Sequence, residues 1–363
     1  MVSSLFGTVV PIGISFIIFQ ALTYPLDVYR GRIAASNTLL DFTFFLVFFP
    51  QLLSGPIVRA AQFLPQTAPG RSLDRDFAAS GLSLVFMGLV KKIALADVIA
   101  AHIVDPAFAQ PAAYSPVFLA IGILAYSIQI YLDLSGYTDM ARGVGRLFGY
   151  DLPINFERPY LATSVSNFWQ RWHITMSSFF RDYLYFGIGG SKSGNVYVNL
   201  LVTFIAIGLW HGAGWNFVLY GALHGSMVGF ERWLRGRRKS RGSDAPNAGW
   251  LVPGSRSLSI LLCFLFVATS RLLFRGGTLA AAGDYLKAMA NWQQPLDLPL
   301  TPLGLAALII GIGLHLTPIE WRERFLAGFG RLPSLAAAAL LAGAFLLFVA
   351  LSEGGTAFIY FQF

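Results

Sequence analysis

Charged side chains are scarce in this chain of 363 residues, since only 12% are charged while 55% are hydrophobic. A typical water-soluble domain carries about twice that share of charged residues, and the mean hydropathy here is +0.61. This composition excludes an ordinary soluble domain and predicts an integral membrane protein. The apolar runs are continuous rather than alternating, which predicts membrane-spanning helices and not a barrel.

Cysteine is nearly absent as well. The one cysteine, Cys263, lies inside an apolar run, so the chain holds no disulfide framework and no CxxC metal motif. An HExxH motif is also missing, and few carboxylates lie near the histidines, so we predict no metal site. The net charge of +8 comes from basic residues placed between apolar runs, which indicates membrane topology rather than nucleic-acid binding.

The basic residues predict the orientation. The densest basic stretch, Glu231 to Gly242, is placed in the cytoplasm by the positive-inside rule. His102 to Ser115 and Ser352 to Phe363 contain no Lys or Arg and are predicted to lie outside. We expect about eight crossings, both termini external, and a stretch from Phe44 to Pro65 that enters and leaves on the same face because of its central prolines.

The sequence RWHIT, Arg171 to Thr175, places a cation and a histidine among aromatic residues. If Asn167 to Phe186 forms one helix, one stripe carries Gln170, His173, Ser177 and Arg181, and the opposite stripe is aromatic. Such a polar stripe must face water, headgroups or protein. Two interpretations stay open here: a functional site, or an interfacial helix whose histidine is incidental.

His211 lies where two apolar runs meet, in the stretch Phe204 to Gly225, and an ionisable residue there indicates function. Gly212 and Gly214 predict an interrupted helix, while Gly208 with Gly212 and Gly221 with Gly225 have the spacing of close helix contacts. A buried His211 would be neutral and able to accept a proton, as acyl transfer to an alcohol requires. His224, His102 and His315 are interpreted as structural.

A third polar stretch, DLSGYTDMARG from Asp133 to Gly143, concentrates Asp133, Ser135, Asp139 and Arg142 where a crossing is expected to end. It is either a cytoplasmic mouth or a hydrated turn, and the residues favour neither.

Two stretches then become recognisable: RPYLATSVSNFWQRWHITMSSFFRDYLYFGIGGSKSGN and NLLVTFIAIGLWHGAGWNFVLYGALHG. They resemble the membrane-bound O-acyltransferase family, in its bacterial branch of alginate O-acetylases and teichoic acid D-alanyl transferases. The resemblance extends from PIGISFIIFQALTYPLDVYRG to the closing FIYFQF, so we treat residues 1–363 as a single membrane domain. Family members usually carry more helices before PIGISF, and these are expected to be missing here.

The resemblance implies a ring of tilted transmembrane helices, with re-entrant and amphipathic helices, around a central tunnel. It implies that His211 of WHGA is the catalytic histidine and His173 the second active-site position. Acetyl-CoA is the implied donor, no cofactor is expected to stay bound, and Arg171, Arg181 or Lys192 would meet the donor phosphates. The candidate substrate-binding residues are Gln170, Arg171, Ser177, Arg181, Trp210 and Asn216.

The expected function is transfer of an acetyl group from a cytoplasmic donor across the bacterial inner membrane, for O-acetylation of an exported, alginate-like polysaccharide. The implied partners are membrane lipid, a secreted acetyltransferase and the exopolysaccharide machinery, with no nucleic acid. D-alanyl transfer toward teichoic acid is the alternative reaction, although LFRGGTLAAAGDYLKAM and the GGSKSG turn favour acetylation. A non-catalytic export channel and a structural assembly subunit are the alternatives from other classes.

Overall fold

The computed structural model describes residues 13–36, 38–52, 55–67, 74–240 and 255–333, together with 335–336, 339–340, 342–343 and 346. These residues form helices and connecting segments, without a strand among them, so the predicted all-helical class is confirmed for the described part of the chain. The chain divides into two compact units. The first comprises 1–97, 130–155 and 317–363, and the second 98–129 and 156–316.

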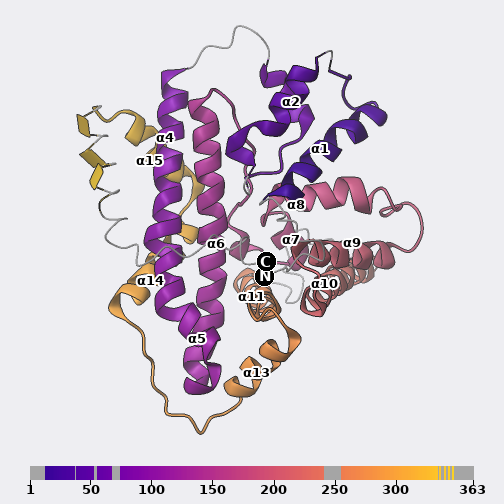
Figure 1. Ribbon diagram of the computed structural model, residues 1–363. Coiled ribbons are helices and arrows are strands. Elements are labelled where there is room, and N and C mark those ends of the chain that lie inside the picture. The colour runs from indigo at the N-terminus through magenta and orange to yellow at the C-terminus, as the bar shows by residue number, and fades with distance from the viewer. Residues whose placement is uncertain are drawn as a thin grey trace, which may run out of the picture. The chain divides into compact units, whose positions relative to one another are not determined.

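The first unit contains the early helices, the second part of a long helix and a late helix (Figure 1). Its elements are α1 (Ile14–Tyr29), α2 (Leu39–Val47), α3 (Ala60–Phe63), α4 (Arg75–Leu89), a π-helical segment (Val90–Asp97), the part of α6 (Pro116–Leu147) from Ile130 onward, and α15 (Ile319–Gly330). The stretch from Phe44 to Pro65 is broken into short pieces, as its prolines predict, but whether it re-enters the membrane stays a prediction.

Helices α4 and α6 lie side by side because glycines let their backbones touch (Figure 1). A Cβ added to Gly81 would lie 2.7 Å from the carbonyl oxygen of Gly143, and one added to Gly88 would strike the carbonyl oxygen of Gly136. The pairing of 81 with 143 and of 88 with 136 makes the two helices antiparallel. In a membrane the hydrophobic effect does not drive helices together, because lipid tails are themselves apolar. Close contact between small residues is a common way for helices to associate there.

The region around α4 and α6 also buries charged side chains, which corrects the interpretation of Asp133 to Gly143 as a hydrated turn. Asp133 to Gly143 is not a hydrated turn, because it lies inside α6 and Asp133 and Asp139 are both buried. Lys91 Nζ lies 2.7 Å from Asp139 and Lys92 Nζ 3.2 Å from Asp133. The turn was a reasonable expectation from composition, but ion pairing with the π-helical segment keeps this polar stretch helical and inside the protein. Whether it forms a cytoplasmic mouth stays untested.

The second unit contains the central helices of the chain (Figure 1). Its elements are a π-helical segment (Ala100–Val104), α5 (Asp105–Ala109), the part of α6 up to Gln129, α7 (Val165–Trp169), α8 (Ile174–Phe179), a π-helical segment (Phe180–Tyr185), α9 (Val196–His211), α10 (Trp215–Ser240), α11 (Arg256–Ser270), α12 (Leu272–Arg275), α13 (Leu279–Met289) and α14 (Pro302–Leu316).

Helices α9 and α10 form a hairpin whose glycines face the neighbouring helix. A Cβ on Gly208 would strike the carbonyl oxygen of Phe217, and a Cβ on Gly225 would lie 3.0 Å from the Cβ of Phe204. Gly221 in turn faces the backbone of Phe204 and Ile205. The close contact that the glycine spacing predicted is therefore present, and it holds the two helices that carry His211 and His224 tightly together.

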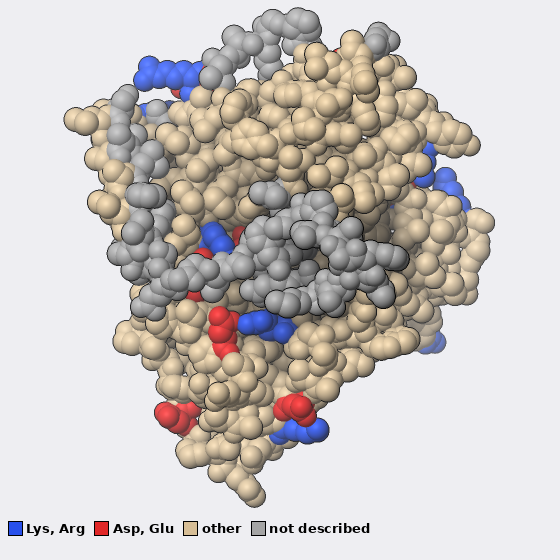
Figure 2. All heavy atoms as spheres, in the orientation of Figure 1, with Lys and Arg blue, Asp and Glu red and all other residues tan. Residues whose placement is uncertain are grey.

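Two described helices are long and apolar enough to cross a membrane, Pro116–Leu147 and Arg256–Arg275. Four shorter apolar helices accompany them: Ile14–Tyr29, Leu39–Gln51, Val196–His211 and Pro302–Leu316. The face in Figure 2 is largely uncharged, with Lys, Arg, Asp and Glu in isolated spots. Eight crossings and the side on which each terminus lies stay predictions, since residues 1–12 and 347–363 lie outside the described residues.

Candidate active site

His211 stands at the end of an interrupted helix. Helix α9 ends at His211, Gly212 is extended, and α10 begins at Trp215, so the predicted break falls directly after the histidine. A side chain at Gly212 would meet the ring of Phe217, which explains why this turn needs a glycine. The imidazole is half-buried, and its centroid lies 4.8 Å from the ring of Phe274.

His173 lies in a turn, and here the prediction of one helix over Asn167 to Phe186 was wrong. Helix α7 ends at Trp169 and α8 begins at Ile174, because His173 adopts left-handed backbone angles, φ 44° and ψ 54°. A non-glycine residue in this region is strained, and such strain collects at functional sites. Its side chain is 2% exposed.

Trp210 brings the two histidines together. Its ring centroid lies 6.1 Å from that of His173 and 4.6 Å from that of His211. The centroids of the two imidazoles are therefore no further apart than the sum of these two distances. Residues 38 positions apart in the sequence thus share one aromatic cluster, which is the arrangement that a base and its partner require.

The protonation of His173 follows from its burial. His173 lies between two short helices, outside the apolar spans, and desolvation lowers its pKa to about 3. The side chain is therefore a neutral imidazole at pH 7. Among the described residues, no group of three His, Cys, Asp or Glu side chains is arranged to hold a metal ion.

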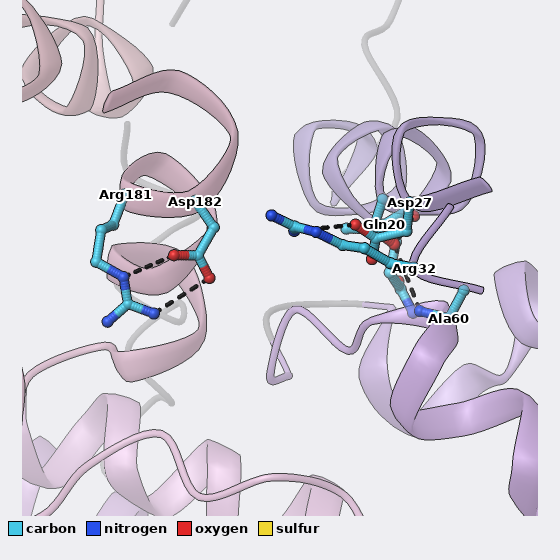
Figure 3. A network of polar contacts seen from close by, with 7 residues as sticks. Gln20, Asp27, Arg32, Ala60, Arg181 and Asp182 are labelled. Atoms are coloured by element: carbon cyan, nitrogen blue, oxygen red, sulfur yellow. Dashed lines mark hydrogen bonds and ion pairs between the residues drawn. The ribbon is translucent and has the colours of Figure 1, made fainter. Parts of the chain in front are cut away.

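A cavity of about 320 Å³ lies between the α7–α8 segment and the α9–α10 hairpin. Gln170, Ser177 and Arg181 line it, so three of the four residues of the predicted polar stripe face one hollow although the predicted helix is broken. Neither imidazole is among its lining residues. Arg181 is already paired, since its guanidinium donates two hydrogen bonds to Asp182, at 2.7 and 3.1 Å (Figure 3).

Other candidate residues have structural partners. The Arg171 guanidinium donates to the Asn167 side chain at 3.1 Å and to the Glu157 carbonyl oxygen at 3.3 Å. Asn216 is buried and donates to the carbonyl oxygen of Leu273 at 3.0 Å, which joins α10 to α12. These two side chains hold the backbone around the histidines and lie outside the lining of the cavity. Lys192 is exposed in a turn.

His224 is buried and fully hydrogen-bonded, as a structural histidine should be. Trp169 Nε1 donates to His224 Nδ1 at 3.1 Å, and His224 Nε2 lies 2.9 Å from Ser270 Oγ. The Ser270 hydroxyl itself donates to the Val267 carbonyl oxygen at 2.7 Å. The Trp169 donor therefore requires Nδ1 to be unprotonated, and Nε2 carries the proton.

Sequence reasoning missed Arg271, a buried cation in the same unit. Its guanidinium lies 4.2 Å from the ring centroid of Trp172 and donates to the hydroxyl of Tyr160 at 2.5 Å and to the carbonyl oxygen of Ser127 at 3.2 Å. Aromatic faces and carbonyl oxygens stabilise a buried guanidinium. The sequence feature that could have identified Arg271 is its position as a single arginine within the apolar run LLCFLFVATSRLLF.

A second cavity of about 220 Å³ lies against α12. Leu272 and Arg275 of that helix line it, together with Asp105 and Tyr285, whereas Phe274 of the same helix turns toward His211. The Arg275 guanidinium lies 2.6 Å from the Asp105 carboxylate.

The sequence that builds this all-helical framework, with His211 at a glycine-interrupted hairpin and His173 in the turn before α8, matches a known family. Residues 33–269 match the membrane-bound O-acyltransferase family, and the chain belongs to that family. The resemblance seen in the sequence is confirmed.

Curated relatives point to one branch of that family. The chain is 37% identical over 317 residues to the probable alginate O-acetylase AlgI of Azotobacter vinelandii, covering 83% of this chain and 60% of that protein. It is 34% identical over 312 residues to the peptidoglycan O-acetyltransferase of Helicobacter pylori, covering 78% and 57%. It is 29% identical over 285 residues to the teichoic acid D-alanyltransferase of Streptococcus thermophilus, covering 73% and 68%. The chain spans about 60% of the length of the alginate relatives that it matches.

Proposed function

We propose that this chain is an O-acyltransferase of the bacterial inner membrane, which passes an acetyl group from cytoplasmic acetyl-CoA to a hydroxyl acceptor for O-acetylation of an exported polysaccharide. The observation that carries the proposal is the meeting of His173 and His211 at Trp210. The cavity between the α7–α8 segment and the α9–α10 hairpin is lined by the predicted residues Gln170, Ser177 and Arg181. Membership in the family and the names of the relatives favour the same chemistry.

His211 is the proposed general base. It takes the proton of the acceptor hydroxyl as the oxygen attacks the thioester carbonyl carbon, and the C–O bond forms. The tetrahedral intermediate collapses, the C–S bond breaks, and His211 returns the proton to the departing thiolate. His173 orients the reacting groups from the other side of Trp210. Nothing is oxidised or reduced, and the imidazole ends the cycle neutral.

The cavity of 320 Å³ is the proposed donor approach. Its residues on α9, Leu200 to Ile207, lie in the middle of that helix, and the basic residues predict that the N-terminal end of α9 is the cytoplasmic one. Leu200, Phe204 and Ile207 suit the uncharged arm of a thioester. Exposed Lys192 is the better candidate for the donor phosphates, because Arg171 and Arg181 already have partners.

The proposal includes the family architecture, a ring of tilted helices around a tunnel that admits donor and acceptor from opposite faces. A secreted acetyltransferase would complete the transfer to the polymer. D-alanyl transfer is the second candidate reaction, and the lower identity of 29% to the D-alanyltransferase, against 37% to the alginate O-acetylase, makes acetyl the favoured group. An export channel without chemistry would leave the paired histidines unexplained.

The test is mass spectrometry of the exported polysaccharide from a strain lacking the gene and complemented with wild-type chain, His211→Ala or His102→Ala. We expect acetyl groups with the wild type and with His102→Ala, since His102 lies outside the cluster, and none with His211→Ala. Full acetylation with His211→Ala, or without any copy of the gene, would refute the proposal. A D-alanyl group found in place of acetyl would establish the alternative reaction.

A further inference from the structure

Helix α10 carries two buried polar side chains that the proposed chemistry does not use. His224 and Glu231 are both fully buried. They lie seven residues apart, which places them on the same face of the helix about two turns from each other. Both of them bind the five-residue helix α7.

Glu231 holds the beginning of α7. Its carboxylate accepts hydrogen bonds from the backbone N–H groups of Val165 and Ser166, at 2.5 and 2.9 Å, and from the Ser166 hydroxyl at 2.5 Å. The first N–H groups of a helix have no partner within the helix. Glu231 thus supplies, from another element, the acceptors that this short helix lacks.

His224 holds the other end of α7. It accepts the hydrogen bond of Trp169, the last residue of the helix, while its own Nε2–H points to Ser270 of α11. The donor and acceptor of each of these hydrogen bonds are therefore fixed, because the Ser270 hydroxyl donates its own proton to the Val267 carbonyl oxygen. Both ends of α7 are therefore attached to α10, and the second end also to α11.

The residue that needs this support is His173, four positions after Trp169. Its left-handed backbone is unfavourable for a histidine and persists only where neighbouring structure holds it. A helix as short as α7 has little stability of its own. Ser166 and Trp169 also line the cavity of 320 Å³, together with Val228, which lies between His224 and Glu231 on α10.

We propose that His224 and Glu231 are positioning residues, which clamp α7 against α10 and so hold His173 in its left-handed turn beside Trp210 and His211. The catalytic importance of His173 rests on the proposed function. The clamp concerns only where His173 is held and does not depend on that function. Its test therefore measures the position of His173 and needs no turnover.

The histidines of the chain supply the probes. Diethyl pyrocarbonate modifies accessible neutral imidazoles, and mass spectrometry reports the modification of each histidine in the full chain purified in detergent. His102 is half-buried and outside the cluster, so it serves as the reactive reference. His315, which is 2% exposed and accepts a hydrogen bond from the backbone N–H of Tyr160, reports whether the rest of the unit stays folded.

In the wild type we expect His173 and His315 to react slowly. In Glu231→Ala and in His224→Phe we expect His173 to react about tenfold faster or more, with His315 and His102 unchanged, because losing a clamp contact lets the turn open locally. His224→Gln, which can still accept from Trp169 and donate to Ser270, should restore most of the protection.

Two results would overturn the proposal. In the first, His173 stays as protected as His315 in both disruptive variants. In the second, His315 becomes reactive together with His173, which would mean that the two residues stabilise the whole unit rather than position one turn. A failure of the proposed function would be seen separately, as acetylation that persists in His211→Ala.

Discussion

The two units bury polar groups in different ways. In the first, Lys91 and Asp139 are opposite charges in contact at 2.7 Å, next to a helix pair in which glycine lies against glycine. In the second, His173 and His211 lie among aromatic rings, and His211 ends the first helix of the α9–α10 hairpin. Paired charges cancel each other and serve the fold, whereas a neutral imidazole can still take a proton. The polar cluster of the first unit therefore suits a structural role, and that of the second suits the chemical role proposed above.

The largest effect on stability should come from breaking the buried pair of the first unit. Lys91→Met leaves Asp139 as a buried charge without its ammonium partner, and we expect a loss of about 3–5 kcal/mol in the free energy of unfolding. The double variant Lys91→Met, Asp139→Leu should recover most of it. Denaturant unfolding in detergent measures both, and a single variant within about 1 kcal/mol of the wild type would contradict a structural role.

A smaller effect should follow from crowding either helix contact. Gly88→Ala in the first unit and Gly208→Ala in the second each push a methyl group into a neighbouring carbonyl oxygen, and we expect about 1–3 kcal/mol of destabilisation. Gly283→Ala on α13 is the matched control, because nothing lies within 4 Å of the added Cβ. Equal stability of all three variants would show that the glycines do not set the helix spacing.

The next effect is a pH dependence due to His173. Because its folded pKa is about 3 and an unfolded histidine titrates near 6.5, below pH 6.5 only the unfolded state takes up this proton. Stability is therefore present above pH 6.5 and falls as the pH drops toward 3, by roughly 1.4 kcal/mol per pH unit. Compared with His173→Gln, the wild type should lose about this amount between pH 5.5 and 4.5. The same loss in both proteins would mean that His173 is not the group responsible.

The smallest effect is expected at the rim of the cavity. Arg181 is more than half exposed and already paired with Asp182, so Arg181→Gln should change the KM for acetyl-CoA by only about one- to fivefold, with kcat unchanged. The KM of Lys192→Gln in the same assay shows how the loss of an exposed lysine compares with the loss of Arg181. A loss of kcat in Arg181→Gln would place this residue closer to the reaction than the structure does.

Much of the second unit could be predicted from sequence because its signals are local. The break after His211 follows from Gly212 and Gly214, and the hairpin contact follows from the spacing of Gly208 with Gly212 and of Gly221 with Gly225. The left-handed turn at His173 could not be predicted, since RWHIT carries no glycine or proline to mark it and distant residues hold it in place.

The polar stretch of α6 was misread for a related reason. Asp133 and Asp139 look like turn residues until Lys91 and Lys92 are known to face them, and their pairing depends on tertiary contact rather than on spacing. Glu231 was counted only as part of a basic loop, because its hydrogen-bond donors lie more than 60 residues earlier in the chain.

The central claim is that His173 and His211 form one site, and a double-mutant cycle tests it most directly. The rate of acetyl transfer from acetyl-CoA would be measured in proteoliposomes for the wild type, His173→Ala, His211→Ala and the double variant. We predict that His211→Ala loses about 10² to 10⁴ in rate, that His173→Ala is also impaired, and that the double variant is no slower than His211→Ala, since residues that act as a unit are not additive. Losses that multiply in the double variant, or wild-type transfer by His211→Ala, would contradict the claim.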